Sequence, residues 1–377
     1  MTINEHFTQL ATRTESPGPF LTLYLDTKGG DGSQKDRVRI LMKQEIARVR
    51  EALDREAREP ENGKEQMIER GIREIESFLN ESLSPEAHGV AIFSSPDEEF
   101  FLPLELAVPV KPELFIGSRP HLRQLAILRH RHPHMLAALV DAKNGRLCEI
   151  RLGKIVDEIT VDDPDVPGRT DQGGWSQANI QRHIQDHINH HQKEVSEKLT
   201  RLHDQRRPEA IILVGQDRNL ANFEQYLPKR VAESIARTIH LDIRAPHEEI
   251  VRECESVLLE ERYEKTRKLV ESLASMAETN GKATLGWSGV AKAVNERKLE
   301  HLLIREDLEA RGWKCSNCSM IGHNVPLGCP SCGESVLTVD LVEQFISAAT
   351  SEQARISFAP ESSPLDDYDG VGAFLRF

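Results

Sequence analysis

Four cysteines near the C-terminal end are the residues whose spacing most clearly predicts chemistry. They form two Cys-x2-Cys pairs, Cys315 with Cys318 and Cys329 with Cys332. Each such turn presents two sulfurs to one ion, and Zn²⁺ prefers four thiolates in a tetrahedron. With four ligands filled, no coordination position remains open for a substrate. The spacing therefore predicts a structural zinc site in a ribbon at residues 313–335; the alternative is four free thiols.

The use of cysteine elsewhere agrees with a reducing compartment. Cys148 and Cys254 stand alone and are expected to pack as small buried apolar groups. Two close pairs without a wider disulfide framework are typical of metal binding in the cytosol. The N-terminus lacks the features of a signal peptide, and no apolar run approaches the ~20 residues of a membrane helix. We therefore expect a cytoplasmic protein with no membrane partner.

A second candidate site is the sequence Asp-Gln-Gly-Gly-Trp-Ser-Gln at residues 171–177. The paired glycines Gly173 and Gly174 allow positive φ and a close approach of the backbone to a ligand. An exposed Trp175 would offer a stacking surface for a nucleobase or a docking anchor. Gln177 lies two residues farther on. The alternative is an ordinary loop with a buried tryptophan.

The charge balance limits the kinds of partner. The net charge of −13 counts against a general nucleic-acid coat protein, since phosphate binding requires clustered Lys and Arg. Residues 35–50 form one local basic segment that could contact RNA. We take its first four basic residues as candidate RNA contacts: Lys35, Arg37, Arg39 and Lys43.

Four histidines follow the loop along a predicted helix. His183, His187 and His190 lie beside its apolar face at metal-compatible spacing, and His191 lies within that face. No carboxylate or cysteine motif accompanies them, so a metal site is not predicted. Whether they have another role is left open by the sequence.

The secondary-structure pattern predicts three α/β modules. The first has a strand at 20–25, two antiparallel helices within 34–80, strands at 89–94 and 100–106, and a linker at 108–120. The second has strands at 134–140, 147–152, 154–161, 210–215 and 238–243, with helices at 176–206, 219–236 and 247–280. The third has helices at 288–296 and 342–350, with strands at 299–304, 337–339 and 372–377. The predicted domains are 1–120, 134–270 and 271–377.

These segments together resemble a known family. The Gly-Gly loop before a long helix resembles the second domain of class 1 peptide chain release factors of archaea and eukaryotes, whose signature there is Gly-Gly-Gln. The stretch ATLGWSGVAKAVNERKLEHLLI, the cysteine insert and the closing DGVGAFLRF resemble their third domain, and LTLYLD their first. The chain is most similar to a bacterial branch related to ribosome-hibernation factors and to tRNA-cleaving quality-control factors.

The resemblance carries expectations about fold and partners. It implies a three-domain architecture with a ribonuclease-H-like middle domain, an α/β/α sandwich third domain and an inserted zinc ribbon. It also implies binding to the ribosome, with ribosomal RNA or tRNA as contacts, and a partner GTPase such as elongation factor Tu.

The sequence departs from the family pattern at two positions that matter for activity. Gly173 and Gly174 match the family glycines, but Trp175 stands where relatives have the catalytic glutamine. Stop-codon readers carry Asn-Ile-Lys-Ser, whereas the nearest stretch here is Ser33-Gln34-Lys35-Asp36. Three functions remain: a factor that occupies the ribosomal tRNA site, a peptidyl-tRNA hydrolase or tRNA-cleaving rescue enzyme, and a non-ribosomal scaffold.

Overall fold

The computed structural model describes residues 3–28, 34–56, 62–162, 177–279 and 281–377. It divides the chain into two compact units. Unit 1 combines Met1–His130 with Arg262–Phe377, and unit 2 is Arg131–Glu261. None of the helices in the described ranges is long and apolar enough to cross a membrane.

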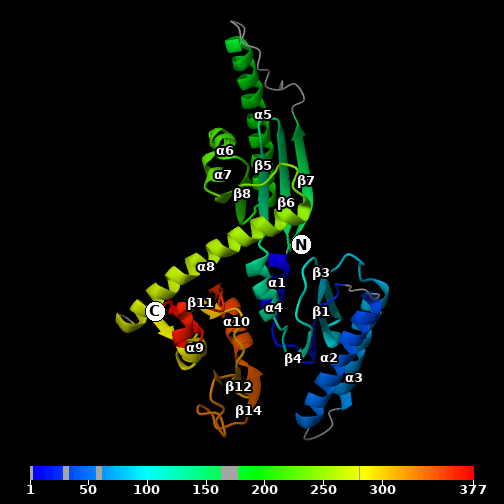
Figure 1. Cartoon of the computed structure of the whole chain (residues 1–377). Helices are drawn as coiled ribbons and strands as arrows, with labels where there is room; N and C mark the ends of the chain where they lie inside the picture. The colour runs from blue at the N-terminus through cyan, green and yellow to red at the C-terminus, as the bar shows by residue number, and fades with distance from the viewer. Residues whose placement is uncertain (1–2, 29–33, 57–61, 163–176, 280) are drawn as a thin grey trace. The chain divides into compact units, whose positions relative to one another are not determined.

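The first part of unit 1 is a four-stranded antiparallel sheet of order β3-β2-β1-β4. Two helices, α2 and α3, cover one of its faces (Figure 1). The strands are β1 (Phe20–Asp26), β2 (Gly89–Ser95), β3 (Phe100–Leu106) and β4 (Glu113–Gly117). The helices are α1 (Ile3–Ala11), α2 (Gln34–Glu56), α3 (Asn62–Glu81) and α4 (Arg123–Arg131), with a 3-10 turn η1 (Pro96–Glu98).

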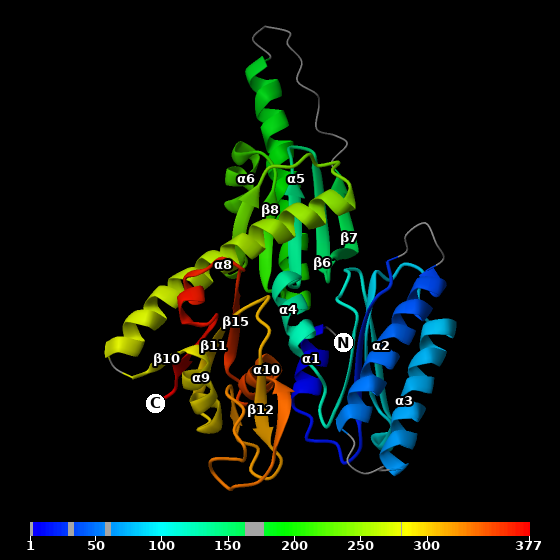
Figure 2. The ribbon, with the colours of Figure 1, turned by 60° about the horizontal axis from the view of Figure 1, so that its bottom comes forward.

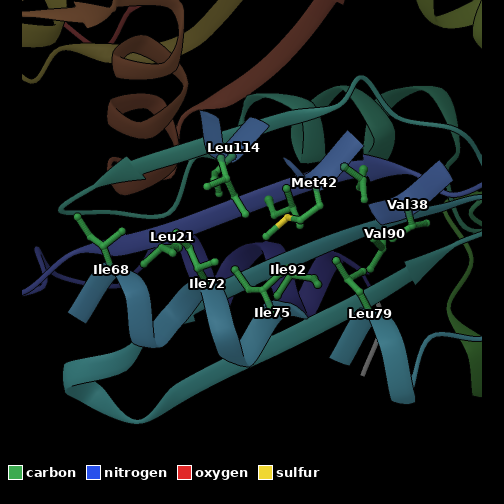
Figure 3. Close-up of a cluster of buried hydrophobic side chains, with 13 residues drawn as sticks. Leu21, Val38, Met42, Ile68, Ile72, Ile75, Leu79, Val90, Ile92 and Leu114 are labelled. Carbon is green, nitrogen blue, oxygen red and sulfur yellow. The ribbon is translucent and has the colours of Figure 1, made fainter. Parts of the chain in front are cut away.

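Alternation along β1 decides which of its side chains meet the helices. Leu21, Leu23 and Leu25 point to one face, as a period of two requires. There they meet apolar residues spaced three and four apart on α2 and α3, which place one face of each helix against the sheet. Figure 3 shows this core, to which the helices contribute Val38, Met42, Ile46, Ile68, Ile72, Ile75 and Leu79.

Unit 2 is a five-stranded sheet of order β7-β6-β5-β8-β9. The strands β5, β6 and β7 form an antiparallel meander, while β8 is parallel to β5 and β9 is parallel to β8. The strands are β5 (Met135–Val140), β6 (Asn144–Arg151), β7 (Lys154–Asp162), β8 (Ala210–Val214) and β9 (Ile235–Ile239). Three antiparallel strands followed by two parallel ones give the expected ribonuclease-H-like arrangement.

Helices cover both faces of this sheet. The long α5 (Gln177–Arg206) packs on one face together with α6 (Asp217–Glu224) and α7 (Lys229–Ala232). The first half of α8 (His247–Thr279) packs on the other face, and Figure 2 shows it crossing in front of β5 and β8 with α5 behind the strands. Cys148 and Cys254 are both fully buried in this second core, as expected for small apolar groups, and burial raises the pKa of each thiol to about 12.

The remainder of unit 1 is a second α/β layer structure. Its sheet has the order β10-β16-β11-β15. The last part of α8 packs on one face of this sheet, and two further helices, α9 and α10, also contact its strands. The strands are β10 (Ala283–Leu285), β11 (Leu299–Arg305), β15 (Arg355–Ala359) and β16 (Val371–Leu375). The helices are α9 (Gly286–Asn295) and α10 (Leu341–Ser351), with a 3-10 turn η2 (Pro364–Tyr368). The cysteine segment forms a small separate sheet of order β13-β12-β14, inserted between β11 and α10. Its strands are β12 (Arg311–Cys315), β13 (Ile321–Gly322) and β14 (Val336–Asp340).

The structure contains several elements that the sequence analysis did not predict, among them α1, α4 and β15. Three further differences have a clear physical cause. The stretch 108–120 is not only a linker, because it contains β4, which pairs with β1 at the sheet edge. The helix expected at 219–236 is divided into α6 and α7, since Pro228 precedes α7 and cannot continue the first helix. The following strand, expected at 238–243, is β9 at Ile235–Ile239, because its pairing with β8 selects an earlier register.

Candidate metal centre and loop region

The four cysteines lie on two turns of similar geometry. The N–H of Cys315 donates to the carbonyl of Met320 at 2.8 Å, and the N–H of Cys329 donates to that of Glu334 at 2.8 Å. In each turn the residue after the second cysteine has a positive φ, 59° at Ser319 and 81° at Gly333. The repeated geometry places the sulfurs of each pair on the same side of the backbone.

The four sulfurs converge on one point. All four ligand atoms lie within 4.8 Å of one another, with 3.4 Å between Cys315 and Cys332 and 3.5 Å between Cys318 and Cys329. A tetrahedral ion with metal–sulfur bonds of about 2.3 Å would hold its sulfurs about 3.8 Å apart. Among the described residues this is the one group of His, Cys, Asp or Glu side chains gathered closely enough to bind a metal ion. The predicted four-cysteine cluster therefore forms, and it could hold one ion.

Backbone amides favour the thiolate form in this cluster. The N–H groups of Cys318 and Asn317 each donate to the sulfur of Cys315 at 3.4 Å. The amide of Cys318 is the main reason that the pKa of Cys315 falls to about 6. Because the thiolate is the metal-binding form, these amides favour metal binding at Cys315. The pKa of Cys318 instead rises to about 12, since the lowering by the amide of Met320 is outweighed by burial and by the neighbouring cysteine sulfurs.

The metal-binding segment has a small core and is attached to α9. Its own core consists of Trp313, Cys315 and Cys329. The side-chain amide of Asn295, the last residue of α9, accepts the N–H of Ile321 at 3.0 Å and donates to its carbonyl at 2.9 Å. At the other end of α9, Trp287 stacks on His323 with 5.3 Å between ring centroids. Loss of the metal should therefore also weaken the contacts that α9 makes with this segment.

The basic residues predicted to contact RNA lie on α2 and are exposed, but most have partners. Arg37 is 2.6 Å from Asp26, and Arg39 is 3.6 Å from Asp36. The ammonium of Lys35 donates to the carbonyl of Asn80 at 3.4 Å. Lys43 is exposed and has no ion pair within the part of the chain that the structure describes. Lys43 is thus the basic residue of this set best placed to meet a phosphate.

The other candidate site lies mostly beyond the described residues. Gly173, Gly174 and Trp175 belong to residues 163–176, which the structure does not describe, and Gln177 is known only as the first residue of α5. On that helix the rings of His183 and His187 lie 4.8 Å apart, whereas His191 is buried and faces the sheet side with Val195 and Leu199. No metal-binding group of three or more ligands includes a histidine in the described part of α5.

Residues 120–257 match the family described as bacterial archaeo-eukaryotic release factor family 10. This segment includes almost all of unit 2 and the Gly-Gly-Trp sequence. This segment of the chain is similar to the archaeo-eukaryotic release factors. The resemblance drawn from the sequence is confirmed.

Two relatives of this release-factor-like chain differ in how much of it they match. Peptide chain release factor subunit 1 of Pyrococcus abyssi is 25% identical over 255 residues, which are 59% of this chain and 61% of that protein. The chain thus spans less than two thirds of that relative. A protein of Mycobacterium tuberculosis strain H37Rv, described as uncharacterized, is 21% identical over 372 residues, covering 96% of this chain and 94% of its own length.

Solved structures of similar proteins come from the same group. The crystal structure of an archaeal translation termination factor covers 100% of this chain and 99% of its own, with 16% identity and a TM-score of 0.27. Archaeoglobus fulgidus Pelota covers 77% of this chain and 79% of its own, with 16% identity and a TM-score of 0.35. Because these TM-scores are low, the fold assignment rests on the strand orders described above.

The sequence analysis of this release-factor-like chain missed one group of ionisable side chains, two of which are buried. His121, Asp340 and Glu343 meet inside unit 1, although Leu122 and Glu343 are 221 residues apart. A local motif could not have indicated this cluster, since only the packing of α10 against the start of α4 brings its members together.

Proposed function

We propose that this protein is a ribosome-associated factor that occupies the ribosomal tRNA site without releasing the peptide. The observation that carries the proposal is Trp175, which stands after the family glycines Gly173 and Gly174 in the segment matched to the release factor family. In release factors the glutamine at this place positions the water that attacks the ester between peptide and tRNA. The proposed role is therefore closer to hibernation or to the recognition of stalled ribosomes than to termination.

The chemistry of the two side chains supports an occupying role. A glutamine amide offers two N–H donors and a carbonyl acceptor, whereas an indole offers one N–H donor and no acceptor. An indole cannot hold a water in the manner of the glutamine, but its flat face can stack on a base. Such stacking is worth about 1–3 kcal/mol per base by alanine substitution.

The metal centre supports a structural role for zinc. Four thiolates satisfy the tetrahedral preference of Zn²⁺ and leave no open position for water or substrate. We therefore assign Zn²⁺ at Cys315, Cys318, Cys329 and Cys332 to the stability of the ribbon and of its attachment to α9, and not to catalysis.

The proposed contacts with RNA and protein partners follow from the family. Lys35, Arg37, Arg39 and Lys43 on α2 would meet RNA, and Trp175 would stack on ribosomal RNA or tRNA. A translational GTPase such as elongation factor Tu is the proposed protein partner, and the cytoplasm is the proposed location. The absence of Asn-Ile-Lys-Ser in the first module argues against stop-codon reading.

A second function is a peptidyl-tRNA hydrolase or a tRNA-cleaving rescue enzyme. The observation in its favour is Gln177, which lies two residues beyond Trp175 and begins α5. Gln177 could replace the family glutamine if the preceding loop is shifted by two residues along the sequence.

A single-turnover assay with ribosome-bound peptidyl-tRNA separates the two functions. For an occupying factor we expect no release by the wild type, and Trp175→Ala should weaken ribosome binding about tenfold, because each 1.4 kcal/mol is a factor of ten. Peptide release by the wild type that is lost in Gly174→Ala or Gln177→Ala would instead establish the hydrolase. Trp287→Ala, which removes the indole of α9 that stacks on His323, is the matched control for the loss of an indole.

A further inference from the structure

A buried carboxylate joins two parts of unit 1 that are distant in the sequence. Glu343, in the first turn of α10, is 6% exposed. Its two carboxylate oxygens accept the backbone N–H groups of Leu122 at 3.0 Å and Arg123 at 2.8 Å. These amides lie at the start of α4, where a helix leaves its first N–H groups without intrahelical partners. A side chain of α10 therefore supplies the N-terminal cap of α4.

His121 lies between this carboxylate and a second one. Its Nε2 is 3.6 Å from Oδ2 of Asp340, and its Nδ1 is 3.5 Å from Oε2 of Glu343. The ring is held in this place by stacking on Phe115 of β4, with 3.5 Å between centroids and 2° between planes. Neither ring nitrogen has a hydrogen bond to another described residue, so the two carboxylates are the polar groups that the ring faces.

The first sheet fixes the backbone on which His121 is mounted. The hydroxyl of Tyr24 donates to the carbonyl of His121 at 2.8 Å, and the N–H of His121 donates to the hydroxyl of Thr22 at 3.1 Å. Both partners are fully buried on β1. The imidazole is thus anchored to the first sheet, whereas the two carboxylates belong to the start of α10.

The net charge of the cluster depends on whether the imidazole of His121 is protonated. Burial lowers the pKa of His121, but Glu343 and Asp340 raise it more, so the pKa lies above its ordinary value. Burial raises the pKa of Glu343. The other charged groups near the ring are Glu113 of β4, which also raises the pKa of His121, and Arg123 of α4, which lies 3.4 Å from Asp340. A neutral imidazole would leave the buried carboxylate of Glu343 and the partly buried carboxylate of Asp340 with Arg123 as their remaining counter-charge.

We propose that His121, Asp340 and Glu343 form a proton-controlled latch between the β4–α4 segment and α10, which is closed while the imidazole is protonated and released when it is neutral. An imidazolium offsets the cost of burying the Glu343 carboxylate and is also attracted to the partly exposed Asp340; the burial cost is high for an unpaired charge. Because the pKa of His121 in the closed state exceeds the ordinary value of about 6.5, the stabilisation is complete below that pH and is lost as the pH rises through the folded value. The raised pKa of Glu343 acts in the same direction.

Release of the latch would uncap α4, whose last residue, Arg131, is the first residue of unit 2. The proposal does not depend on ribosome binding, because it concerns contacts within unit 1. It can therefore be tested on the isolated chain without ribosomes.

Hydrogen exchange of the Leu122 and Arg123 amides measures the latch directly, since these two N–H groups bind Glu343. After correction for intrinsic exchange, we expect a loss of protection as the pH rises from about 6 to about 8.5, because the imidazole loses its proton above its ordinary pKa. Unchanged protection across this range would overturn the proposal.

Two variants and a matched control identify the responsible groups. His121→Gln should give low protection at both pH values. Glu343→Gln keeps an oxygen for the amides but removes the charge, so the pH dependence should disappear. His134→Gln changes another buried histidine, 2.8 Å from Glu149 in unit 2, and should keep the wild-type pH dependence at Leu122 and Arg123. A wild-type pH profile in either His121→Gln or Glu343→Gln would refute the latch, and Glu343→Gln suffices for the test if His121→Gln does not fold.

Discussion

Replacing Cys329 with serine should release the metal ion and loosen the ribbon that contains it. Cys329 is buried, and its sulfur lies 3.5 Å from that of Cys318. Structural Zn²⁺ contributes about 10–16 kcal/mol in zinc-finger peptides, so each of four thiolates accounts for about 3 kcal/mol. The loss of one should weaken metal binding more than about a hundredfold. The ribbon has few buried side chains of its own, so it should lose order together with the ion.

Metal analysis and limited proteolysis test this prediction. The wild type should carry about one equivalent of zinc, and Cys329→Ser much less, with new protease cleavage within residues 315–333. Cys148→Ala removes a buried thiol of unit 2 that is not a ligand, and it should keep the full metal content. The reasoning fails if Cys329→Ser retains zinc with unchanged affinity, or if the metal-free protein resists protease as well as the wild type.

Three further predictions address binding and stability. Lys43→Glu should weaken ribosome co-sedimentation at low salt, and the difference should vanish as salt screens phosphate contacts; Lys229→Glu, which changes an exposed side chain of α7, should have no such effect. Burial lowers the pKa of His301 to about 4, so its stabilising effect is present above about pH 6.5 and is lost as the pH falls toward 4. The free energy of unfolding in urea should then drop by about 3 kcal/mol in the wild type, and a full drop in His301→Gln would contradict this assignment. Ile75→Ala, which empties a fully buried site (Figure 3), should cost about 2–5 kcal/mol. The exposed Ile40→Ala should cost less than about 0.5 kcal/mol, and equal costs would argue against the α3 packing.

Elements with a strong local pattern were predictable from the sequence. The alternation of Leu21, Leu23 and Leu25 identified β1, and the regular apolar spacing of α5 identified that helix, because each pattern places one apolar face toward a core. The edge strand β4 was missed. Its sequence has little alternation, and its formation depends on pairing with β1, which lies far away along the chain.

The metal site could be predicted from the sequence, whereas the latch could be found only in the tertiary structure. The spacing of Cys315, Cys318, Cys329 and Cys332 predicted their convergence, because residues three apart share one turn and present their sulfurs together. No such local constraint links His121 to Glu343. Their contact exists because α10 packs against the start of α4, and burial there makes the charge of each group depend on the other. Local geometry therefore determined the metal ligands, whereas tertiary packing alone decided which distant ionisable groups meet in a low-dielectric environment.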